Sequence, residues 1–241
     1  MPITNQASGT NINEIAERIY RISTPVDAIP GGFTFNQYLI VDQAPLLFHT
    51  GLRKMFPLVR EAVASVTPVT SLRYIAFSHF EADECGSLND WLGVAPNAVP
   101  LCGKMAAMLS VNDVADRPPQ TLGDGEVLSL GASSVRWFDT PHLPHGWECG
   151  YLMEEKTRTL FCGDLFTQPG SNPPAITEGD ILGPSEALRA KLDYYAYAPN
   201  SRELFAKLAS SKPAVLACMH GSAWRGDGAA LLRELSAKIA K

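Results

Sequence analysis

Short apolar runs that end in polar residues constrain the fold of this chain more than any other feature of its sequence. Clusters of histidine and acidic residues at 79–84, 142–145, 164 and 220 each follow a strand-like apolar run. Loops at strand ends, held by a rigid sheet, are the usual place for functional side chains. Strand-like runs alternate with helical stretches, which predicts layers of the α/β or α+β type.

Local patterns predict the individual elements. Hairpins are expected at 35–51, 125–141 and 150–164, because two apolar runs flank a turn in each range. The other expected elements are strands at 71–79 and 214–220, a strand end with a short helix at 100–111, and helices at 54–66, 201–211 and from Ala229 to the end. The proline- and glycine-rich stretch 171–199 is interpreted as a lid-like insertion in a single domain spanning 1–241.

The stretch SHFEADECG at 78–86 contains His79, Glu81, Asp83 and Glu84. Three neighbouring carboxylates repel one another, and burying them without a partner would cost several kcal/mol. Bound cations would neutralise them. Imidazole combined with carboxylate suits a divalent transition metal, whereas an oxygen-only set would suit magnesium or calcium. The sequence therefore predicts a transition-metal site, with a solvated acidic loop as the alternative.

Several motifs resemble the metallo-β-lactamase superfamily, and within it the di-iron branch of flavodiiron proteins and oxygen-binding di-iron proteins. The motifs are His-x-Glu-x-Asp at 79–83, a later histidine, Gly-Asp at 163–164 and MHGSAWRG at 219–226, together with FNQYLIVD at 35–42 and LFCGDLF at 160–166. The hydrolytic branch normally carries a histidine in place of Glu81. The resemblance implies a single αββα sandwich, with two sheets between helical layers and a metal site at the strand ends.

The resemblance also implies a set of metal ligands. One iron would be held by His79, Glu81 and His145, the second by Asp83 and His220, and Asp164 would bridge both. His142 is the alternative to His145, which is favoured because it lies 19 positions before Asp164, as in the di-iron branch. His142 would then orient a ligand. Glu84 stands where many flavodiiron proteins have a histidine, and it either binds the second iron or stays outside the ligand set.

The implied function is a non-haem di-iron protein that binds or reduces dioxygen, or nitric oxide, with electrons from an external donor protein. An oxygen carrier or sensor is one alternative. A binuclear metallo-hydrolase acting on an ester or phosphate is another, but Glu81 argues against it. Two iron ions are expected, with zinc or manganese as substitutes, because affinity order alone does not exclude zinc. The residues after His220 are too few for a flavodoxin-like domain, so no flavin is expected in this chain.

Composition narrows the remaining classes. A formal net charge of −5 and no basic run argue against a nucleic-acid partner, and no apolar stretch suggests a membrane span. The N-terminus lacks the features of a secretory signal. Five cysteines without a CxxC pair suit reduced thiols in a cytoplasm; Cys85 and Cys149 adjoin the predicted site and are either redox thiols or packing residues. A homodimer is one expected assembly.

Overall fold

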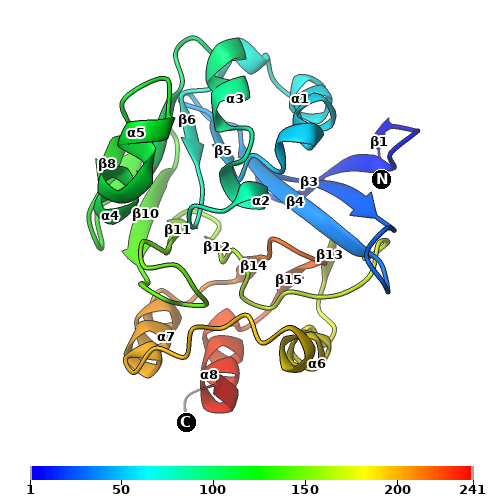
Figure 1. Ribbon diagram of the computed structural model, residues 1–241, viewed down its shortest axis with the longest axis vertical. Coiled ribbons are helices and arrows are strands. Elements are labelled where there is room, and N and C mark those ends of the chain that lie inside the picture. The colour runs from blue at the N-terminus through cyan, green and yellow to red at the C-terminus, as the bar shows by residue number, and fades with distance from the viewer. Residues whose placement is uncertain (1, 240–241) are drawn as a thin grey trace.

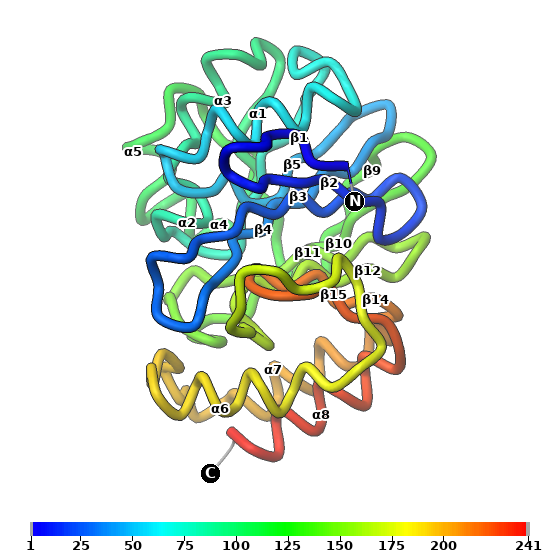
Figure 2. Tube along the Cα trace, turned by 90° about the vertical axis from the view of Figure 1, so that its right-hand side faces the viewer, coloured from blue at the N-terminus to red at the C-terminus, as the bar shows by residue number. Residues whose placement is uncertain are grey.

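Two β-sheets stacked face to face form the centre of the molecule, and helices cover both outer faces (Figure 1). The computed structural model describes residues 2–239. Figure 2 shows the same layers after a quarter turn, with α6, α7 and α8 on one side and α1, α3 and α5 on the other. The predicted αββα sandwich is confirmed.

The first sheet runs in the order of the sequence, from β1 to β8. Its strands are β1 (Ile3–Asn5), β2 (Thr10–Ala16), β3 (Ile19–Val26), β4 (Phe33–Ile40), β5 (Leu46–Phe48), β6 (Tyr74–Ala76), β7 (Val99–Gly103) and β8 (Gln120–Leu122). Neighbours from β1 to β5 are antiparallel, and neighbours from β5 to β8 are parallel. The parallel part lets β6 end at the same edge as its neighbours.

The second sheet has the strand order β13-β15-β14-β12-β11-β10-β9. Its strands are β9 (Val127–Ser129), β10 (Ser134–Asp139), β11 (Gly150–Glu154), β12 (Thr159–Phe161), β13 (Ile176–Thr177), β14 (Val215–Ala217) and β15 (Ala223–Arg225). Strands β12 and β14 lie side by side and run parallel, with Phe161 paired with Ala217. The segments that follow these two strands therefore leave the sheet at the same edge.

The helices belong to two groups. Those of the first half are α1 (Phe56–Ala64), α2 (Ala82–Cys85), α3 (Leu88–Val94), α4 (Lys104–Ala106) and α5 (Asn112–Val114), with short turns η1 (Arg53–Met55), η2 (Val69–Ser71) and η3 (Ala107–Val111). Those of the second half are α6 (Leu182–Leu192), α7 (Ser201–Ser210) and α8 (Gly228–Ile239). None of the helices within residues 2–239 is both long and apolar enough to cross a lipid bilayer.

Three apolar clusters hold the layers together. One lies between the first sheet and its helices, where α1 buries Val59, Ala62 and Val63 on a single face. Another lies between the two sheets and includes Phe48 and Trp137. A third packs the second sheet against its helices. Each sheet is thus fixed on both faces, which gives the loops at its edge a rigid base.

The predicted hairpins at 35–51, 125–141 and 150–164 correspond to β4–β5, β9–β10 and β11–β12. The helix expected from Ala229 begins at Gly228, and residues 240–241 lie outside the described part. Two parts were not anticipated. The N-terminal strands β1 to β3 were not predicted, and the stretch 171–199 contains β13 and α6.

Candidate metal centre

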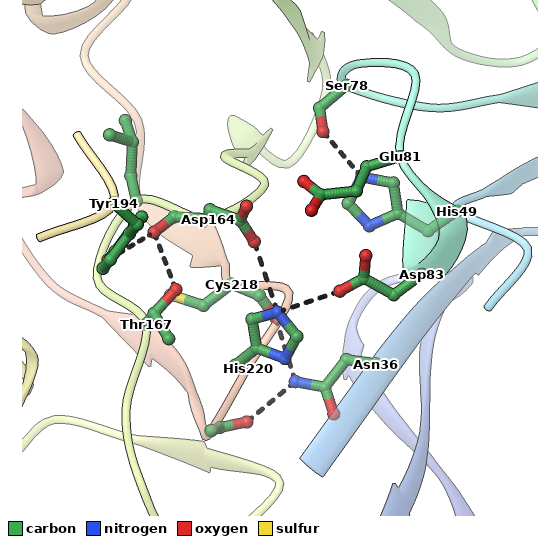
Figure 3. Close-up of polar contacts among 12 residues, drawn as sticks. Asn36, His49, Ser78, Glu81, Asp83, Asp164, Thr167, Tyr194, Cys218 and His220 are labelled. Atoms are coloured by element: carbon green, nitrogen blue, oxygen red, sulfur yellow. Dashed lines mark hydrogen bonds and ion pairs between the residues drawn. The ribbon is translucent and has the colours of Figure 1, made fainter. Parts of the chain in front are cut away.

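The predicted ligands come together at one edge of the sandwich because each follows a strand that ends there. His79 follows β6, His145 lies after β10, Asp164 after β12, and His220 after β14. Glu81 and Asp83 lie at the start of α2, directly after His79. Figure 3 shows Glu81, Asp83, Asp164 and His220 facing a common space. Residues up to 141 positions apart therefore meet through the topology of two sheets.

The first group consists of His79, Glu81, His145 and Asp164. One nitrogen or oxygen atom of each lies within 4.8 Å of the others. The Oε2 atom of Glu81 lies 2.9 Å from Nε2 of His79 and 3.0 Å from Nε2 of His145. The Oδ2 atom of Asp164 lies 3.8 Å and 3.5 Å from the same two nitrogens. Two imidazoles and two carboxylates therefore surround one point.

The second group consists of Asp83, Asp164 and His220. Nε2 of His220 lies 3.5 Å from Oδ2 of Asp83 and 3.3 Å from Oδ1 of Asp164. Asp164 thus presents Oδ2 to the first group and Oδ1 to the second. A carboxylate whose two oxygens face two groups of ligands has the arrangement of a bridge between two metal positions.

Each imidazole has its other ring nitrogen fixed by a hydrogen-bond partner. Nδ1 of His220 lies 2.8 Å from the Thr34 carbonyl oxygen, and Nδ1 of His145 lies 3.0 Å from the Tyr194 carbonyl oxygen. A carbonyl can only accept, so both rings donate from Nδ1, and Nε2 is the nitrogen of each ring that faces the carboxylates of the site. Such partners hold a metal-binding ring in the required orientation.

His79 is fixed by a chain of side chains instead of a carbonyl. Its Nδ1 lies 3.0 Å from Oγ of Ser78, which lies 3.1 Å from Nε2 of His49. His49 is fully buried, and its burial lowers its pKa to about 3, so its ring is neutral. In the consistent arrangement His79 donates to Ser78, and Ser78 donates to His49. His49 therefore helps to orient His79 through Ser78.

The loop that carries His220 is held by buried polar groups of the first sheet. The hydroxyl of Tyr38 donates to the Cys218 carbonyl oxygen at 2.6 Å, and the guanidinium of Arg21 donates to the Gly221 carbonyl oxygen at 2.7 Å. The Asn36 amide donates to both carbonyls, at 2.9 and 2.8 Å. These contacts link residues at least 180 positions apart, and so no local pattern could have predicted them.

The loop that carries Asp164 depends on a glycine. Gly163 has a positive φ of +48°, and a Cβ atom there would lie 2.9 Å from Oγ of Ser78. The Asp164 carbonyl oxygen accepts hydrogen bonds from Thr167 at 2.8 Å and Tyr194 at 3.2 Å (Figure 3). The Gly-Asp pair is therefore explained by a close approach of two loops.

The acids and imidazoles of the site shift one another's pKa values through hydrogen bonds and charge. The hydrogen bonds from His145 and His79 hold the pKa of Glu81 well below its usual range. Burial would raise the pKa of Asp164, but its contact with His220 and the nearby imidazoles lower it to about 2. Burial would lower the pKa of His220, but Asp164 and Asp83 outweigh it and raise that pKa to about 9.

Other residues singled out in the sequence lie outside these two groups. His142 is exposed, whereas His145 is in the first group. Cys85 is buried and donates to the Glu81 carbonyl oxygen at 3.2 Å, and burial raises its thiol pKa to about 12. Cys149 is buried and donates to the Leu143 carbonyl oxygen at 3.1 Å. Both thiols have the contacts of packing residues.

The donor set fits a pair of transition-metal ions. Oδ1 of Asp164 is buried, and among the described residues it makes no hydrogen bond besides its 3.3 Å ion-pair contact with Nε2 of His220. Phe33 stacks on the His220 ring at 4.3 Å and Phe35 meets its edge at 5.2 Å, so an apolar wall limits water on that side. The Glu81 side chain is 52% exposed, and the site therefore opens to solvent there. Imidazoles mixed with carboxylates suit divalent iron, manganese or zinc better than calcium.

Comparison with known proteins identifies the family. Residues 33–181, more than half of the chain, match the family model described as "ODP family beta lactamase". The chain belongs to this family. The resemblance to the metallo-β-lactamase superfamily and to flavodiiron proteins is thereby confirmed.

Relatives and solved structures agree with this assignment. The chain is 29% identical to rubredoxin-oxygen oxidoreductase of Megalodesulfovibrio gigas, over 82% of this chain and 50% of that protein. It is 28% identical to putative diflavin flavoprotein A 1 of Nostoc, over 73% of this chain and 31% of that protein. The flavodiiron protein of Giardia intestinalis has the same fold, with a TM-score of 0.81 at 19% identity over 94% of this chain and 58% of that chain. The chain spans half or less of the length of these two curated relatives.

Proposed function

We propose that this protein is a non-haem di-iron protein that binds and reduces dioxygen or nitric oxide, with electrons from an external donor protein. The observation that carries the proposal is Glu81, whose carboxylate lies between His79 and His145 at 2.9 and 3.0 Å. An imidazole would be neutral in that place. A carboxylate adds negative charge and a hard donor, which favours a metal that changes oxidation state.

In this proposal His79, Glu81 and His145 would hold the first iron, and Asp83 and His220 would hold the second. Asp164 would offer one oxygen to each position. Two ferrous ions bound there would supply one electron each and a Lewis-acidic surface for a diatomic ligand. The protein keeps the three Nε2 atoms aimed at the site, through Ser78 and the carbonyls of Tyr194 and Thr34.

Electrons beyond those of the two ions come from a separate redox protein. Two of the relatives carry names that indicate this chemistry, namely an oxidoreductase paired with rubredoxin and a diflavin protein. Because the chain matches only part of each, the electron supply is a proposal for this chain. Zinc or manganese would fit the same donors, so the metal found in a preparation depends on its supply.

An oxygen carrier or sensor is the second candidate, because the same donors would bind a diatomic ligand without turnover. A hydrolase is the third. The chain is 25% identical to an atrochrysone carboxyl ACP thioesterase of Aspergillus novofumigatus, over 98% of this chain and 75% of that protein. A cavity of about 630 Å³, lined by Phe80, Glu81 and Leu88 among others, adjoins the site and has room for a larger substrate.

Anaerobic spectroscopy separates the three candidates. Iron-loaded protein is reduced with dithionite, freed of excess reductant and mixed with buffer containing oxygen. Consumption of dissolved oxygen in proportion to the reducing equivalents supplied supports the reductase. A lasting adduct without turnover supports the carrier or sensor. Hydrolysis of a thioester by zinc-loaded protein, without any oxygen reaction of the iron form, supports the hydrolase.

A further inference from the structure

Glu84 is a buried acid next to the metal centre that the ligand set above does not use. Its side chain is fully buried on α2, and neither carboxyl oxygen has a hydrogen-bond partner in the described part of the chain. One oxygen each of Glu81, Asp83 and Glu84 lies within 4.8 Å of the others. The carboxyl group therefore faces the site and not the apolar core.

An acid in this position is costly without a cation. Burying a polar group that lacks a partner is unfavourable, and burying a charge is more so. The acids Glu81 and Asp83 each place a carboxyl oxygen within 4.8 Å of one of Glu84. No lysine or arginine forms an ion pair with it among residues 2–239. A metal ion would satisfy the two orphaned oxygens and offset the acids around them.

We propose that Glu84 is a direct ligand of the second metal ion, beside Asp83, Asp164 and His220. Glu84 directly follows Asp83 in α2, and one carboxyl oxygen of each lies within 4.8 Å of the other. The main chain is held there because the Glu84 carbonyl oxygen accepts a hydrogen bond from the Thr50 amide at 2.7 Å. This inference rests on the proposed pair of metal ions.

The two metal positions then differ in their donors. The first has the imidazoles of His79 and His145 with two carboxylates. The second has the single imidazole of His220 with three carboxylates. Carboxylate oxygens suit manganese, whereas imidazole suits zinc, copper, iron and nickel. The second position therefore discriminates against zinc more strongly than the first, and its ion is the one that favours the higher oxidation state.

Metal titration of variants tests the assignment. Wild type, Glu84→Gln and Glu84→His are stripped with a chelator and titrated with Mn²⁺ and with Zn²⁺, with the exposed Glu178→Gln as the matched control. Glu84→Gln should weaken the second equivalent of Mn²⁺ by more than about 100-fold and leave the first within about threefold. Removing a residue that only orients a ligand lowers metal affinity by about 10–100-fold. A loss of affinity below about 100-fold would therefore overturn the assignment. Glu84→His should restore the second ion and shift its preference toward Zn²⁺.

A crystal structure of Mn²⁺-loaded wild-type protein keeps the test independent of whether the variants fold. An oxygen of Glu84 within about 2.3 Å of the second ion supports the proposal, and a distance beyond hydrogen-bond range overturns it. The proposed function fails separately, if wild-type protein takes up zinc and never iron. If wild-type protein binds two ions and Glu84→Gln binds them equally well, only the role of Glu84 is contradicted.

Discussion

Removing the metal should make the protein lose stability as the pH rises from 6.5 to 9. Without metal, the imidazolium of His220 lies between Asp164 and Asp83, which raise its pKa from 6.5 to about 9. A raised pKa means that the folded state holds a proton that the unfolded state releases above pH 6.5. That stabilisation is complete below pH 6.5 and is lost as the pH rises through 9.

The size of the effect follows from the shift. At 1.36 kcal/mol for each pKa unit, His220 contributes about 3 kcal/mol. His79 and Glu84 act in the same direction, because the pKa of each is raised in the folded state. His49 adds nothing in this window, because its pKa is lowered to about 3 and it is neutral throughout. For a chain of this size, about 3 kcal/mol corresponds to a fall in melting temperature of about 6–12 °C.

Thermal melts of chelator-stripped protein at pH 6.5 and pH 9, followed by circular dichroism, measure this fall. Metal-loaded protein is the control. Because bound metal needs neutral imidazole, its stability should hold or rise over the same range. His220→Gln should remove the His220 share of this pH dependence, about 3 kcal/mol, and leave the share of His79 and Glu84. A melting temperature of stripped wild type that stays constant or rises with pH would refute the reasoning.

Three further outcomes follow from the site. His145→Ala should lose metal from one position, while His142→Ala should keep both ions with affinity weakened by no more than about 10–100-fold; elemental analysis showing the reverse would mean that the histidines are misassigned. Ser78→Ala should weaken metal binding by about 10–100-fold, because it frees the rings of His79 and His49 to rotate, and unchanged affinity for Mn²⁺ would show that this chain does not orient His79. NADH alone should leave the absorption spectrum of flavin-free, iron-loaded protein unchanged, whereas dithionite should bleach it. The reason is that NADH donates a hydride, and a flavin is needed to pass its electrons one at a time to iron. Rapid reduction by NADH would contradict the need for an external donor.

Part of the fold was readable because it is encoded locally. The hairpin β4–β5 has two apolar runs around a turn at Asp42, and α1 shows the spacing of a helix with one buried face. The N-terminal strand β2 largely alternates in burial and could have been predicted from that pattern, but it was missed, whereas β3 is buried at four consecutive residues and shows no such alternation. Helix α6 was missed for a different reason. Few of its residues are buried, so the stretch lacks a clear apolar stripe.

The candidate site was predicted as a list of residues, and its geometry was not. Spacing favoured His145 over His142, and the structure brings His145 into the first group. The sequence does not show that the two oxygens of Asp164 face different groups. It also does not show that Tyr38 donates a hydrogen bond to the loop that carries His220. Both depend on strands β12, β14 and β4 meeting in space, and contacts at such separations leave no local pattern.

The metal content of the native protein tests the central claim most directly. Protein produced in iron-replete medium without added zinc is purified anaerobically and its metals are measured per chain. We expect close to two metal ions for each chain, with more iron than zinc, about 3.5–4 Å apart by anomalous scattering at the iron edge. Stoichiometric zinc with no iron under these conditions would contradict it and would favour the hydrolase.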